Sequence, residues 1–149
     1  MRREIARGRR YGARFSFVLV GIDHIETLTA KIGPNTMAIL RERVADLVLR
    51  ETRTTDVIAH ISHGKIGALL PETPPEGAYL LAERVRRHVE RVLTPTALQH
   101  GEAVHVSVGV SAWRDDPSLT VDALMKEAED ALLNAQSEGG NRSKVYLVA

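Results

Sequence analysis

Four polar side chains of this chain belong to residue types that bind transition metals. His60 and His63 are spaced H-x-x-H across a predicted hairpin, and Asp23 and His24 directly follow a strand-like run. Imidazole and carboxylate groups suit Zn²⁺ or Ni²⁺. The alternative is that these residues are partly exposed and fill a cleft without an ion. We favour the alternative, because H-x-x-H across a hairpin is a weak metal signature.

Arginines form the second group that could do chemistry. Arg53-Thr54-Thr55-Asp56 places a guanidinium and a carboxylate three residues apart. Such a string is common by chance, and an arginine near an aspartate is usually an exposed ion pair of little energetic weight. A basic cluster also lies on one helical segment, where interspersed Glu83 and Glu90 make surface pairs the default. The cluster comprises Arg84, Arg86, Arg87 and Arg91.

The composition predicts one globular domain and excludes several classes of partner and site. The 149 residues are 44% hydrophobic, which is enough to bury a core. Twenty Lys and Arg against 19 Asp and Glu leave a net charge of +1, so no chain-wide positive field indicates nucleic acid. Aromatic residues, at 4%, are too scarce for a surface that stacks single-stranded bases. The absence of cysteine excludes disulfides and thiolate metal sites, and it suits a reducing compartment.

The N-terminal sequence MRREIARGRR is basic, but no apolar stretch with a small-residue cleavage site follows it. No apolar run approaches the roughly 20 residues of a membrane-spanning helix. We therefore expect a cytoplasmic domain without direct membrane insertion. Residues 1–12 are expected to form a helical or linker segment, and residues 13–149 the folded domain.

The pattern along the chain predicts an α/β (α+β) fold. Apolar and β-branched runs predict strands at 14–22, 56–61, 66–70, 104–112 and 144–148. Amphipathic spacing predicts helices at 25–32, 35–50, 74–92 and 120–137, with Asn35 and Thr120 as N-caps and 94–102 as a loop. This order predicts one mixed sheet of about five strands with helices packed on its faces.

The element order and several short sequence motifs resemble those of the GGDEF domain of bacterial diguanylate cyclases. The similar stretches run from residue 11 to residue 146 and include FVLVGIDHIETL, ETRTTDVIAHISHGKIGALLPET, LAERVRR, VHVSVGVSA and EDALLNAQSEGGNRSKVY. The resemblance implies a nucleotide-cyclase-like central sheet flanked by helices, with a β-hairpin at the active site.

A cyclase of this family condenses two GTP molecules into cyclic di-GMP, and the reaction needs Mg²⁺ held by carboxylates. The resemblance places those two carboxylates at Gly21 and Gly64. Lys65 stands where the family has the hairpin's glutamate, and its charge would repel a cation. The whole hairpin reads Ser62-His63-Gly64-Lys65-Ile66 in place of Gly-Gly-Asp-Glu-Phe. The resemblance therefore implies a degenerate active site with no catalytic residue, no metal and no cofactor.

Four further functional positions of the family differ in this chain. The two guanine-binding positions correspond to Thr29 and Ala38, and the two phosphate-binding positions correspond to Gln136 and Gly140. A neighbour such as Asp23 could replace one lost ligand, but not metal, base and phosphate contacts together. We expect neither cyclase activity nor GTP binding at this site.

A second site of the family is kept. Many of its cyclases bind their product as an inhibitor through an Arg-x-x-Asp motif before the hairpin, and Arg53 and Asp56 stand at that position. Arg84 corresponds to a third ligand on the next helix. A guanidinium can donate to guanine O6 and N7, and a carboxylate can accept from the opposite edge. The resemblance implies a receptor for cyclic di-GMP.

Two alternatives to this receptor remain open. The domain could be a ligand-free module for dimerisation or for docking a partner signalling protein, in which case it would bind no nucleotide. It could also be a residual enzyme that uses nonstandard ligands, which a turnover assay with GTP and Mg²⁺ or Mn²⁺ would reveal.

Overall fold

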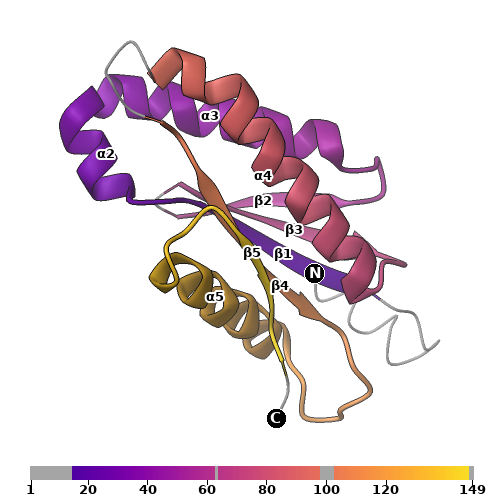
Figure 1. Cartoon of the computed structure of the whole chain (residues 1–149). Helices are drawn as coiled ribbons and strands as arrows, with labels where there is room; N and C mark the ends of the chain where they lie inside the picture. The colour runs from indigo at the N-terminus through magenta and orange to yellow at the C-terminus, as the bar shows by residue number, and fades with distance from the viewer. Residues whose placement is uncertain (1–14, 63, 98–102, 148–149) are drawn as a thin grey trace.

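The computed structural model describes residues 15–62, 64–97 and 103–147, which form one mixed α/β domain around a five-stranded sheet (Figure 1). The predicted segment 1–12 and His63 lie outside the described residues. The strands are β1 (Phe15–Ile22), β2 (Val57–Ser62), β3 (Lys65–Pro71), β4 (Val106–Ala112) and β5 (Ser143–Val145). The helices are α2 (Ile25–Ile32), α3 (Pro34–Glu51), α4 (Pro75–Ala97) and α5 (Val121–Ser137).

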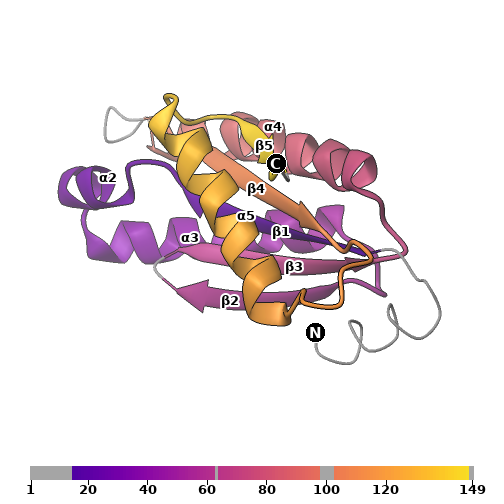
Figure 2. The same cartoon turned by 90° about the horizontal axis from the view of Figure 1, so that it is seen from below.

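The strand order is β2-β3-β1-β4-β5, so β1 lies at the centre of the sheet. It pairs antiparallel with β3 and with β4, while β5 pairs parallel with β4. Figure 2 shows helices α3 and α4 on one face of the sheet and α5 on the other. The fold is the α/β arrangement that the sequence predicts.

Side chains of β1 alternate between two cores, because successive residues of a strand point to opposite faces. Val18, Val20 and Ile22 pack in the larger core beneath α3 and α4. Phe15, Phe17 and Leu19 pack in the smaller core beneath α5. By the same alternation Gly21 faces α5, which decides what surrounds that position.

Several sequence-based boundaries are wrong, among them the start of β4, which lies at Val106 rather than at residue 104. Asn35 is not an N-cap, because α3 already begins at Pro34 with Gly33 as its cap and no side-chain cap bond. The helix α4 extends to Ala97, so part of the predicted 94–102 loop is helical. The last strand ends at Val145 rather than at residue 148. Thr120 does cap α5, since its side chain accepts from the Ala123 N–H at 3.0 Å.

Among the described residues, no helix is both long and apolar enough to cross a membrane.

Candidate functional site

The position at Gly21 is closed by helix α5. A Cβ atom added to Gly21 would lie 3.0 Å from Leu132 Cδ2 and 3.4 Å from Gln136 Nε2. Gly21 and Gln136, which the sequence assigns to the same former active site, are therefore neighbours. The ends of the Leu132 and Gln136 side chains therefore line the space beside residue 21.

Lys65 lies directly beside this position. It is the cross-strand partner of Gly21 in the β1–β3 ladder. Its Nζ is 3.8 Å from Glu129 Oε1 on α5, so the two side chains form a partly exposed ion pair. The Glu129 carboxylate is therefore already paired with the ammonium group of Lys65.

Gly64 occupies the hairpin turn with a φ of 75°, a conformation that favours glycine. A Cβ atom there would lie 2.7 Å from Ile25 Cδ1 and 3.3 Å from Arg41 Cδ. Neither Gly64 nor Gly21 offers an oxygen ligand from its side chain, and Lys65 is cationic. These residues do not fit Mg²⁺, which needs carboxylate oxygens.

Asp23 ties the end of β1 to the turn after α5. The carboxyl group is buried, and its Oδ2 accepts from the Asn141 N–H at 2.7 Å and from the Ser107 hydroxyl at 3.1 Å. Gly140 lies against it, because an added Cβ would be 2.7 Å from Asp23 Oδ2. Asp23 therefore has a structural role, because its carboxylate links the end of β1 to Asn141 and Ser107. Any side chain at position 140 would have to displace this carboxylate.

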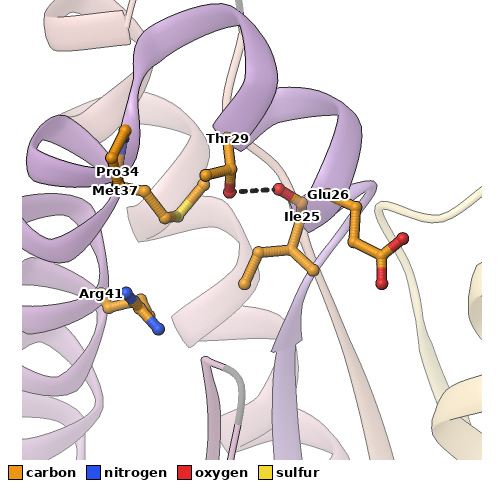
Figure 3. A pocket seen from close by; sticks show the side chains of 6 residues that line it. All are labelled: Ile25, Glu26, Thr29, Pro34, Met37 and Arg41. Carbon is orange, nitrogen blue, oxygen red and sulfur yellow. Dashed lines mark hydrogen bonds between the residues drawn. The ribbon is translucent and has the colours of Figure 1, made fainter.

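A cavity of about 430 Å³ lies between α2 and α3 (Figure 3). Its lining residues are Ile25, Glu26, Thr29, Pro34, Met37 and Arg41. The Thr29 hydroxyl donates to the Ile25 carbonyl oxygen at 2.5 Å, so its hydrogen is used within its own helix. Ala38, the other position assigned to base recognition, is exposed on α3. Neither residue offers the pair of polar contacts that selects a guanine edge.

Arg53 and Asp56 close a tight turn at the start of β2. The Arg53 N–H donates to Asp56 Oδ2 at 2.7 Å, and the Asp56 N–H donates to the Arg53 carbonyl oxygen at 3.0 Å. The Asp56 side chain is only 1% exposed, and its Oδ1 has no hydrogen-bond partner within the described part of the chain. The structure brings the two predicted residues together, with the carboxylate facing inward.

The guanidinium of Arg53 is anchored yet accessible. Its Nη2 donates to the Pro71 carbonyl oxygen at 2.8 Å and to the Thr73 hydroxyl at 2.6 Å, and it lies 3.6 Å from Asp56 Oδ1. The side chain is still 58% exposed. Sequence reasoning missed Thr73, because no spacing rule links residue 53 to the segment that follows β3.

Arg84 projects from α4 toward the end of α3. Its Nε donates to Glu51 Oε2 at 3.1 Å, and the other Glu51 oxygen is 2.6 Å from His88 Nδ1. Arg84 is 56% exposed, whereas Glu51 is 15% exposed. No hydrogen bond or ion pair joins Arg84 to Arg53 among the described residues, but Glu51 precedes Arg53 by two positions. Sequence reasoning missed Glu51 and His88 as partners.

The sequence predicts that Arg86 lies on a solvated basic face, and this prediction is wrong. Arg86 is 16% exposed and donates two hydrogen bonds to Glu83, at 2.7 and 2.9 Å, and a third to the Asn141 side chain at 2.9 Å. The Ser143 hydroxyl also donates to Glu83. The bonds from Arg86 hold the pKa of Glu83 below its ordinary value, and burial opposes this shift less strongly. This cluster joins α4 to β5.

The described residues contain no group of three or more His, Cys, Asp or Glu side chains that could hold a metal ion. His63 lies outside the described residues, and the side chain of His60 is not described either. The metal site at His60, His63, Asp23 and His24, which the sequence disfavours, therefore stays untested as a whole. Asp23 Oδ2 already accepts hydrogen bonds from Asn141 and Ser107, whereas Asp23 Oδ1 has no hydrogen-bond partner among the described residues.

Comparisons with known proteins give one consistent family. A family model described as "Diguanylate cyclase, GGDEF domain" matches residues 1–142. The chain is 24% identical to the diguanylate cyclase DosC of Escherichia coli over 145 residues, which are 97% of this chain and 31% of that protein. It is 28% identical over 141 residues to the response regulator PleD of Caulobacter vibrioides, covering 87% of this chain and 29% of that protein. The chain thus spans less than a third of the length of these relatives.

Solved structures show the same fold. The active GGEEF domain of a diguanylate cyclase from Vibrio cholerae superposes with a TM-score of 0.89 at 20% identity, covering 99% of this chain and 92% of that one. The GGDEF domain of DgcB from Caulobacter crescentus in complex with c-di-GMP gives 0.84 at 19% identity, covering 97% and 85%. The cyclase SiaD with its activator SiaC from Pseudomonas aeruginosa gives 0.83 at 26% identity, covering 97% and 54%.

Proposed function

The chain belongs to the GGDEF domain family of diguanylate cyclases, and from that membership we propose that it is a catalytically inactive, degenerate GGDEF domain that acts as a cyclic di-GMP receptor. It binds through Arg53, Asp56 and Arg84 and serves bacterial second-messenger signalling in the cytoplasm. It passes the bound state to a second copy or to a partner signalling protein.

The lack of a carboxylate at positions 21 and 64 supports the absence of catalysis. Leu132 covers Gly21, and the charge next to it on β3 is the Lys65 ammonium rather than a carboxylate. A triphosphate in this place would lack the divalent cation that neutralises it during attack of a ribose hydroxyl.

One observation carries the receptor proposal: an exposed guanidinium is held beside a carboxylate at the start of β2. The Pro71 carbonyl and Thr73 anchor Nη2 of Arg53 while 58% of the side chain stays accessible. A guanidinium whose position is fixed loses less conformational entropy when it binds a guanine edge or a phosphate. Arg84 adds a second exposed guanidinium, so the ligand's two phosphate charges can both be matched.

Calorimetry with cyclic di-GMP tests the receptor proposal. We expect binding in the micromolar range or tighter, and we expect it to be lost in Arg53→Ala and weakened in Arg84→Ala. Arg50→Ala near the end of α3 and Arg91→Ala on α4 are controls, because each removes an exposed arginine close in sequence to a proposed ligand but not assigned to the site itself. No binding heat at high ligand concentration, or equal losses in the controls, would overturn the proposal.

A separate assay tests the absence of catalysis. The protein is incubated with GTP and either Mg²⁺ or Mn²⁺, and the products are separated by chromatography. We expect no cyclic di-GMP above a protein-free blank. Turnover that disappears in Lys65→Ala or in Asp23→Asn would instead support the residual enzyme with nonstandard ligands.

One observation favours a ligand-free interaction module as the second candidate. The Asp56 carboxylate is 1% exposed and already accepts the Arg53 N–H, so it is not presented to a ligand in this arrangement. Such a module would bind no cyclic di-GMP, and its oligomeric state would not respond to the nucleotide. Light scattering with and without cyclic di-GMP separates the two candidates.

A further inference from the structure

The residues that line the cavity between α2 and α3 could bind a small molecule other than cyclic di-GMP. Its volume of about 430 Å³ falls in the range of small-molecule sites. Ile25, Pro34 and Met37 supply an apolar lining, and Met adapts readily to flat or irregular shapes. The cavity can therefore desolvate a ring or a short hydrocarbon chain.

Among the described residues of this lining, Arg41 supplies the one cationic group. Within the described residues, Arg41 makes no hydrogen bond or ion pair, although it is half-buried. Its Cδ lies near the hairpin turn, 3.3 Å from where a Gly64 Cβ would be, so the turn restricts its stem. In Figure 3 its guanidinium lies on the side of the cavity opposite Glu26. A half-buried guanidinium without a partner favours an anion that can accept from its planar fork.

The remaining polar groups of the lining do not favour a nucleotide base. The Thr29 hydroxyl already donates to the Ile25 carbonyl oxygen. Glu26 is exposed, and its carboxylate points away from Thr29 and Met37 in Figure 3. The described lining residues thus combine apolar walls with one anion-binding group, and they offer no matched set of polar groups for the edge of a purine.

We propose that the α2–α3 cavity binds a small organic anion with an apolar body, either a carboxylate or a phosphomonoester, whose charged group is held by Arg41. The site is separate from Arg53 and Arg84, so the inference does not depend on cyclic di-GMP binding. The apolar body lies against Ile25, Pro34 and Met37.

Titrations followed by ¹H–¹⁵N NMR test the proposal with four probes: 2-naphthoate, 1-naphthyl phosphate, neutral 2-naphthalenemethanol and inorganic phosphate. We expect saturable shifts at Thr29 and Met37 with one or both naphthyl anions, and the stronger of them identifies carboxylate or phosphate as the preferred group. The neutral probe should bind at least about tenfold more weakly, which corresponds to the loss of one charge-assisted hydrogen bond. Inorganic phosphate keeps the charge but has no apolar body to bury against the lining, so it should also bind at least about tenfold more weakly.

Variants separate the charge from the cavity. Arg41→Gln should weaken naphthyl-anion binding by about tenfold or more, whereas Arg50→Gln, a matched change on the same helix, should not. Thr29→Phe fills the cavity and keeps Arg41, so it should abolish binding even if Arg41→Gln proves poorly folded. Arg53→Ala should leave the naphthyl anions unaffected.

The proposal is overturned if neither anion shifts Thr29 and Met37, or if Arg41→Gln and Thr29→Phe both bind as the wild type does. Tighter binding of GTP than of naphthyl phosphate at these residues would also overturn it, because the cavity would then select a nucleotide.

Discussion

Arg84 and Glu51 form an ion pair between the middle of α4 and the last residue of α3, with Nε and Oε2 3.1 Å apart. The same carboxylate lies 2.6 Å from His88 Nδ1. Glu51 is therefore paired with the Arg84 guanidinium, which the proposed receptor site needs. An anionic ligand would have to compete with Glu51 for Arg84.

Replacing Glu51 should strengthen ligand binding. In Glu51→Gln the competing charge is gone, and because an exposed ion pair contributes about 0–1 kcal/mol, affinity for cyclic di-GMP should rise by up to about fivefold. Calorimetry measures this, and Glu42→Gln on the exposed part of α3 is the control. Weaker binding in Glu51→Gln would mean that Glu51 positions Arg84 for the ligand instead of withholding it.

Asp56 should matter for stability whether or not a ligand binds. Asp56→Ala removes the acceptor of the Arg53 N–H bond and should lower the free energy of unfolding by about 1–2 kcal/mol in urea. Thr55→Ala, at an exposed position of the same turn, should change it little. If the two variants are equally stable, the bond from the Arg53 N–H to the Asp56 carboxylate contributes nothing net, and Asp56 can then be used as a clean binding probe.

Glu83 should make the protein sensitive to acid. Its pKa is lowered in the folded state, mainly by hydrogen bonds from Arg86. The stabilisation is therefore fully present above the ordinary glutamate pKa of about 4.3 and is lost as the pH falls through the lowered value. We expect Glu83→Gln to be less stable at pH 7 and to lose less stability below pH of about 4.3 than the wild type.

Unfolding curves in urea at several pH values measure this difference. Glu76→Gln, at an exposed position in the first turn of α4, serves as the control and should follow the wild type. Parallel pH profiles for Glu83→Gln and the wild type would contradict the assignment of acid sensitivity to the Glu83–Arg86 pair.

Alanine at two glycines should separate packing from backbone strain. Gly33 and Gly140 both have positive φ values, of 90° and 76°. A Cβ at Gly33 meets nothing within 4 Å, whereas one at Gly140 comes within 2.7 Å of Asp23 Oδ2. Gly33 has a ψ of 157°, in a backbone region that is essentially restricted to glycine, so Gly33→Ala reports backbone strain without a clash. Thermal unfolding should show a loss for both variants, but Asp23→Ala should reduce only the loss caused by Gly140→Ala in the double variant. A loss at Gly140 that Asp23→Ala leaves unchanged would indicate strain alone.

Local patterns predicted the elements well, because their causes are local. The apolar run of β1 is buried at all eight positions, and the spacing of Ile25, Leu28 and Ile32 gave both ends of α2 correctly. Pairings between distant residues could not be predicted in this way. Asp23 meets Asn141 across 118 positions, and Arg53 meets Thr73 across 20. The resemblance to GGDEF domains identified Arg53 and Arg84 as candidate ligands. Nothing in the sequence pattern indicates that Glu51 pairs with Arg84 or that the Asp56 side chain points inward.

The close contact between α5 and Gly21 has a consequence for any attempt to restore a carboxylate at this position. A Cβ atom at position 21 would lie 3.0 Å from Leu132 Cδ2, so the end of the Leu132 side chain would have to shift by a few tenths of an ångström. A redesign of this part of the molecule therefore has to treat β1 and α5 together, because the effects of residues in contact do not simply add.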